Sequence, residues 1–310
     1  MRALLVGSFA TLLMAAACTG IYQSFQGFFR FAAADTATES FKPKAISLVL
    51  AGGLINALLG PELVRLMGDA MAPTPYAGAY ATIVALNLIG ALVLVFLRIP
   101  KPAARVSGAD AGRPLGVIFR EPKVIAAVLC AMISYAVMSL VMTSTPLAMV
   151  AHGFHSDNAA DVVRWHVVAM YAPSFFTGHL IARFGHLPVI SVGLALLAAC
   201  AGIALSGVEI HKFYLALIAL GLGWNFGFIG ATSMLATTHT AAEQARVQGL
   251  NDFLVFGLVS VASFSSGALL NAFGWTAVQL AVLPSLFLAV VIIVLLGRRR
   301  RRRLLSAPTS

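Results

Sequence analysis

The sequence predicts an all-α, polytopic membrane protein with about nine transmembrane helices. Three observations lead to this prediction. Hydrophobic residues make up 60% of the 310 positions and charged residues only 10%, whereas soluble domains average about 25% charged residues. The apolar residues are gathered into runs that are long enough to cross a bilayer. The Lys and Arg residues cluster in short segments between these runs, as they do in membrane proteins.

Nine apolar runs have the length of a membrane-spanning helix, which needs about 20 mostly apolar residues. None of them shows sustained alternation of apolar and polar residues, which is typical of strands in a membrane β-barrel. Because backbone polar groups in hydrocarbon must be satisfied within each segment, the runs are predicted to be helices. The predicted spans are 8–33, 44–66, 76–98, 124–150, 163–183, 187–206, 213–236, 251–272 and 276–297.

The basic residues also predict how the chain is organised and oriented. A basic, proline-rich linker (99–123) separates a partial N-terminal bundle of three helices (1–98) from a C-terminal bundle of six (124–297). Nine spans place 17 of the 21 Lys and Arg residues on one side, which the positive-inside rule makes cytoplasmic. The linker and the basic tail (298–310) are then cytoplasmic. The expected localisation is the cell membrane, in bacteria the inner membrane, with the lipid bilayer as a partner.

Other partners and cofactors are not expected from the composition. The net charge of +10 is compatible with nucleic-acid binding, but the charge lies in bands at the ends of spans, so no nucleic-acid partner is predicted. Cys18, Cys130 and Cys200 lie singly within apolar runs, so we predict no disulfide, metal site or cofactor. The first 18 residues resemble a lipoprotein signal peptide, but the apolar character continues to Ala34, so we interpret them as part of a span.

Polar side chains in four spans suit the lining of a solute cavity, and on the first and fourth spans they recur on one helical face. On the first span these are Tyr22, Gln23 and Gln26, on the fourth Tyr135, Ser139 and Thr143, on the second Asn56, and on the seventh Trp224 and Asn225. Hydrogen bonding between packed helices is the alternative explanation for such residues. The aromatic ring of Trp224 is suited to stacking on a flat solute.

Four further residues are candidates for proton transfer or gating. His166 lies near one end of the fifth span, and a histidine can relay protons, although a structural role is the alternative. Arg30 continues the polar face of the first span, where it can also reach toward the membrane surface. Asp252 begins the eighth span, at a helix N-terminus that favours a carboxylate. Arg183 is the last residue of the fifth span, at the start of a short loop.

Several motifs resemble those of the major facilitator superfamily of transporters. The stretch GGLINALLGPEL (52–63) is similar to the Gly-Pro motif of helix five in that family. The stretch GHLIARFGHLPV (178–189) resembles the family's loop motif G-x-L-x-D-R-x-G-R, with Ala182 in place of Asp and His186 in place of the last Arg. The resemblance implies a partial fold that comprises helices four to twelve, with the first three helices missing. It also implies a solute cavity lined by the spans that hold Gln26, Tyr135 and Asn225.

The function predicted from these features is secondary active transport of a small organic solute by alternating access. The resemblance implies H⁺ as the coupling ion. A non-transporting receptor, an assembly partner and an inactive fragment of a transporter are the alternatives. An enzyme is not expected, because the sequence contains no HExxH, GxSxG, P-loop or dinucleotide-binding motif.

Overall fold

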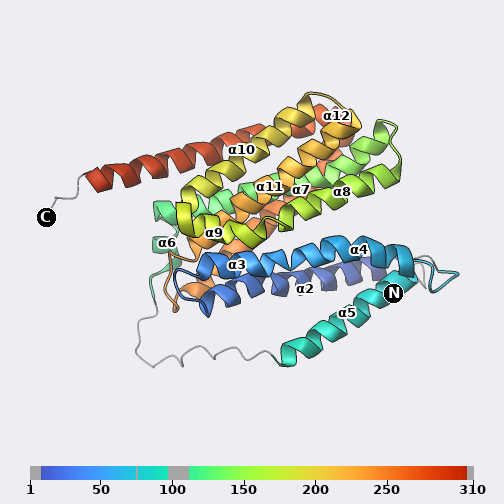
Figure 1. The fold of residues 1–310 in the computed structure, drawn as a ribbon, viewed down its shortest axis with the longest axis horizontal. Coiled ribbons are helices and arrows are strands. Elements are labelled where there is room, and N and C mark those ends of the chain that lie inside the picture. The colour runs from blue at the N-terminus through green and yellow to red at the C-terminus, as the bar shows by residue number, and fades with distance from the viewer. Residues whose placement is uncertain (1–7, 75, 97–111, 306–310) are drawn as a thin grey trace.

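The computed structural model describes residues 8–74, 76–96 and 112–305, and within these ranges every regular element is a helix (Figure 1). The helices are α2 (Phe9–Asp35), α3 (Lys42–Ala51), α4 (Gly53–Met67), α5 (Ala77–Val95), α6 (Leu115–Ile118), α7 (Pro122–Ala151), α8 (Ser156–Tyr171), α9 (Ser174–Phe184), α10 (His186–Leu205), α11 (Ile210–Leu235) and α12 (Gln244–Leu305). This architecture confirms the predicted all-α fold class.

The helices follow the predicted spans, although some spans are divided. Span 44–66 is split at Gly52 into α3 and α4, and span 163–183 is split at Pro173, which has no N–H for a helical hydrogen bond, into α8 and α9. The helix α12 holds two spans, because Gly274 with a φ of 79° interrupts it. Six stretches of the described chain are long and apolar enough to cross a membrane: Lys42–Met67, Ala77–Val95, Pro122–Ala151, His186–Leu205, Ile210–Leu235 and Gln244–Arg298.

In the C-terminal bundle, α11 lies among α7, α8 and α10, while α12 packs on α7 and α10 (Figure 1). The helices α10 and α11 touch backbone to backbone. A methyl group at Gly193 would lie 2.8 Å from the Cα of Gly227 and 2.9 Å from the carbonyl oxygen of Gly223. Small residues at these positions therefore allow the close approach that stabilises helix pairs in membranes.

The N-terminal helices α2, α3 and α4 lie along one side of this bundle (Figure 1). The closest contact joins α3 to α9, where a methyl group on Gly178 would lie 2.6 Å from the Cα of Lys44. The Gly178 N–H donates to the Ser47 hydroxyl at 3.1 Å, and that hydroxyl donates to the Ser174 carbonyl. Ala182, which replaces the usual Asp of the loop motif, is exposed. Backbone groups and one hydroxyl therefore make this contact.

The helix α5 stands apart from most of the other helices and packs on the end of the N-terminal layer, against α4 (Figure 1). Most of its side chains beyond the first turn are apolar and exposed, for example Leu88 at 67% and Val95 at 77%. An outward apolar face of this kind is unfavourable in water and favourable against hydrocarbon.

The end of the linker is attached to the C-terminal bundle by a buried carboxylate. Glu243, which is 1% exposed, accepts hydrogen bonds from Arg113 Nε at 2.7 Å, Nη2 at 2.9 Å and the backbone N–H at 2.8 Å. The Thr240 N–H donates a fourth at 3.0 Å. The hydrogen bonds from Arg113 hold the pKa of Glu243 well below its ordinary range, so the carboxylate stays ionised. Arg113 also pairs with Glu121, the residue that precedes α7.

We expect Gly193→Ala to destabilise the protein by about 1–3 kcal/mol, because the added methyl group forces α10 away from α11. Gly202→Ala, on the same helix, is the control: a methyl group there meets no atom within 4 Å. Thermal unfolding of the purified protein in detergent measures both variants. Equal melting temperatures for Gly193→Ala and Gly202→Ala would contradict the close α10–α11 contact.

Candidate functional site

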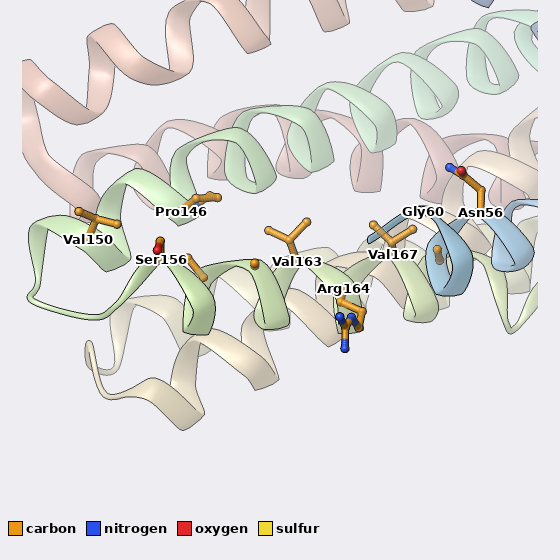
Figure 2. A pocket seen from close by; sticks show the side chains of 11 residues that line it. Asn56, Gly60, Pro146, Val150, Ser156, Val163, Arg164 and Val167 are labelled. Atoms are coloured by element: carbon orange, nitrogen blue, oxygen red, sulfur yellow. The ribbon is translucent and has the colours of Figure 1, made fainter. Parts of the chain in front are cut away.

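A cavity of about 560 Å³ opens between α4, α7 and α8 (Figure 2). Each helix contributes one face to it, with residues three or four positions apart. Its walls are mostly small and apolar, with a few polar groups. The lining residues are Asn56, Ala57, Gly60, Pro146, Val150, Ser156, Ala159, Ala160, Val163, Arg164 and Val167.

The polar groups of the cavity are few and differ in how they are held. Asn56, a predicted cavity residue, is exposed on the cavity wall, and its amide makes no hydrogen bond to another described residue. Arg164 lies 3.7 Å from a carboxylate oxygen of Glu62 and 3.7 Å from one of Asp161. These separations indicate loose ion pairs that contribute little to stability. An apolar pocket with a few polar groups is the usual form of a small-molecule site.

A cluster of aromatic rings from α7, α8, α11 and α12 lies next to this region. Trp224 and Phe228 stack with their ring centroids 5.2 Å apart. The ring of Tyr135 packs edge-on against Trp224 at 5.4 Å, Phe228 at 5.1 Å and Phe256 at 5.7 Å. Tyr171 packs edge-on against Trp224 at 5.7 Å. The structure thus brings together Tyr135 and Trp224, which the sequence predicted as cavity residues on separate spans.

A buried ion pair lies beside the aromatic cluster and joins the N-terminal helices to the C-terminal bundle. Arg30 on α2 donates from Nη2 to Asp252 Oδ1 on α12 at 2.6 Å, and the two residues are only 4% and 7% exposed. The Arg30 guanidinium lies 4.9 Å from the ring centroid of Phe228. Asn251 also donates to Asp252 Oδ1, at 3.1 Å. Two predicted gating candidates, 222 residues apart in sequence, are therefore direct partners.

The side chain of Asn225, a predicted cavity residue, makes hydrogen bonds between three helices. It is fully buried between α11, α8 and α9. Its amide nitrogen donates to the Met170 carbonyl and to the Ser174 hydroxyl, each at 2.6 Å. Its oxygen accepts from the Thr177 hydroxyl at 2.6 Å. These bonds occupy the side chain in helix packing, which is the alternative that the sequence left open.

The other predicted residues lie in several places. His166 is buried, and its Nδ1 lies 2.8 Å from the Leu217 carbonyl, which favours a proton on Nδ1. Arg183 is exposed and rests on the ring of Phe184 at 5.3 Å, away from the ion pair. Ser139 and Thr143 lie on α7 between the aromatic cluster and the cavity. The side chains of Tyr22, Gln23 and Gln26 lie outside the described part of the chain.

Sequence reasoning missed Tyr171 and Phe256 of the aromatic cluster and most of the cavity wall on α8. Valine and alanine at these positions carry no signal that separates a cavity wall from a packed face. Tyr171 lies five residues after His166, and its contact with Trp224 depends on how α8 and α11 pack.

The family model of the Major Facilitator Superfamily matches residues 127–309, which is more than half of the chain. This chain belongs to the major facilitator superfamily. The riboflavin transporter RfnT of Brucella anthropi is 46% identical over 285 residues, which cover 92% of this chain and 72% of that protein. The match confirms the resemblance seen in the motifs, and it identifies the chain as a multi-pass membrane transporter.

More distant relatives agree with this assignment. The uncharacterized MFS-type transporters YdeG and YddS of Bacillus subtilis are 30% and 29% identical, over 84% and 93% of this chain and 65% and 70% of those proteins. The chain thus spans about two thirds to three quarters of the length of these relatives. A bacterial homologue of the iron transporter ferroportin, solved in an outward-facing state, has a TM-score of 0.59 and 14% identity, over 84% of this chain and 65% of that one. At this identity, the match supports the fold alone.

The ion pair of Arg30 and Asp252 leads to a stability prediction. Removing one partner leaves a buried charge alone, so Arg30→Met is expected to lower stability by about 3–5 kcal/mol. The double variant Arg30→Met/Asp252→Leu removes both charges and should be more stable than Arg30→Met. Melting temperatures of the purified proteins in detergent measure this difference. Losses that simply add in the double variant would show that the two side chains do not interact.

Proposed function

We propose that this transporter carries riboflavin, or a closely related flavin, across the bacterial cell membrane by alternating access, with H⁺ as the coupling ion. The observation that carries the proposal is the 46% identity to a riboflavin transporter over 92% of this chain. The proposal specifies the class of the predicted small organic solute, which would be a planar heteroaromatic compound with a polar tail.

The site geometry supports such a solute. A volume of about 560 Å³ falls within the range of small-molecule pockets, about 300–1,000 Å³. Within the aromatic cluster, the partly exposed rings of Tyr135, Tyr171 and Phe256 are flat apolar groups of the kind on which a heteroaromatic ring stacks. The exposed amide of Asn56 and the hydroxyl of Ser156 supply polar contacts on the cavity wall.

The ion pair of Arg30 and Asp252 is the proposed coupling element. In this conformation it connects α2 and α12, and the Gln244 amide donates to Asp35 between the same two helices. Separating two buried charges is costly, because each loses its partner in a medium of low dielectric. A proton on Asp252 would neutralise the carboxylate and lower this cost. Proton binding would thereby favour the separation of α2 from α12.

In the proposed orientation, the linker and the C-terminal tail face the cytoplasm. The linker and the C-terminal tail carry most of the positive charge outside the spans and are placed in the cytoplasm by the positive-inside rule. With that orientation, the contacts between α2 and α12 close the cytoplasmic end of the site.

We expect proteoliposomes that contain the purified protein to exchange labelled riboflavin and to accumulate it when a proton gradient is imposed. Asp252→Asn keeps an oxygen that accepts from Arg30 but cannot take up a proton. This variant should therefore keep riboflavin exchange and lose accumulation driven by the gradient. A protonophore should abolish accumulation by the unaltered protein to the same level.

Two outcomes would count against the proposal. A single symmetric peak on size exclusion would show that the protein is folded. If such protein exchanges no riboflavin, the substrate assignment is wrong. Gradient-driven accumulation by Asp252→Asn would leave the substrate in place and remove Asp252 from coupling.

A further inference from the structure

The cavity and the aromatic cluster are adjacent, and one side chain lies between them. Val163 and Val167 line the cavity from α8, and Tyr171 follows them one helical turn further along the same face. On α4, Asn56 and Gly60 line the cavity, and Gly53 continues their face by one turn toward Tyr171.

Both faces end at the same contact. The ring of Tyr171 lies directly against the backbone of Gly53, so that a methyl group there would be only 2.6 Å from two ring carbons. On its other side the ring meets Trp224, with centroids 5.7 Å apart. Tyr171 therefore bridges α4 and α11 one helical turn beyond the cavity-lining residues Val167 and Asn56, on the side where the aromatic cluster begins.

The Tyr171 side chain is held by ring contacts alone. Among the described residues none forms a hydrogen bond with its hydroxyl, although the residue is only partly exposed. Movement of the ring would thus break no hydrogen bond. The Tyr171 ring can occupy this position because Gly53 has no side chain.

We propose that Tyr171 is a movable seal between the cavity and the aromatic cluster, and that a planar heteroaromatic solute stacks on its ring before reaching Trp224. The stacking role rests on the proposed flavin transport, whereas the sealing role does not. In the sealed position the ring of Tyr171 packs on the backbone of Gly53.

The seal can be tested without any solute. In a variant that lacks Cys18, Cys130 and Cys200, Ser139→Cys places a thiol on α7 between Tyr135 and the cavity residue Pro146. Labelling by a membrane-impermeant maleimide, in right-side-out and inverted vesicles, reports access to this thiol. Val163→Cys, within the cavity, is the control.

We expect Ser139→Cys to react slowly with Tyr171 present and about tenfold faster with Tyr171→Ala, which removes a ring contact of the kind worth about one power of ten. Tyr171→Phe, which keeps the ring, should leave labelling slow. Labelling of Val163→Cys should be the same with each residue at position 171. Equal labelling of Ser139→Cys with Tyr171 and with Tyr171→Ala, in variants that elute as folded protein, would overturn the proposal.

Transport kinetics test the stacking role. Tyr171→Ala is expected to raise the KM for riboflavin about tenfold, while Tyr171→Phe should change it less than about twofold. Gly53→Ala should also raise the KM, because its methyl group displaces the ring, but it should add nothing to Tyr171→Ala.

Independent effects of Gly53→Ala and Tyr171→Ala would show that the glycine does not act through the ring. An unchanged KM in Tyr171→Ala would remove the stacking role. If the unaltered protein moves no riboflavin, the proposed function fails, and the maleimide result still decides whether Tyr171 seals the cavity.

Discussion

Hydrocarbon offers no hydrogen bonds, so each polar group inside this bundle must find a partner on another helix or remain costly. The hydrogen bonds and ion pairs that result hold the helices together. Asn225 connects α11 to α8 and α9 through Met170, Ser174 and Thr177. The ion pair of Arg30 with Asp252 connects α2 to α12. Two groups that lack such a partner among the described residues, the Asn56 amide and the Tyr171 hydroxyl, lie at or beside the cavity.

Glycine determines how close the helices come, and it does so with two different results. Between α10 and α11, Gly193 and Gly227 bring two backbones into contact, which leaves no space for a ligand. Between α4 and α8, Gly53 makes room for a ring instead of a backbone. The cavity begins one turn further along, where Asn56 and Gly60 face α8. Glycine thus allows contact between two backbones at one interface and contact between a backbone and an aromatic ring at the other.

Hydropathy predicted the position of the helices well, because burial in lipid is decided by the composition of each segment. Hydropathy could not predict which side chains contact each other, because these contacts depend on how distant segments pack. Arg30 and Asp252 were singled out separately, and only the fold shows that they meet. The polar character of Asn225 was noticed correctly, but sequence cannot separate a hydrogen bond between helices from a solute contact. Tyr171 was missed because its significance comes from Gly53 and Trp224, which lie on two other helices.

Two of the contacts between the N-terminal helices and the C-terminal bundle differ in kind, and this difference bears on the proposed coupling. At the contact of α3 with α9, backbones touch at Gly178 and Lys44. In contrast, α2 reaches α12 through side chains, by Arg30 with Asp252 and by Asp35 with Gln244. Backbone packing does not respond to a proton, whereas a carboxylate paired with a guanidinium does. We therefore propose the contact between α2 and α12 as the place where a coupling proton changes the energy of separation.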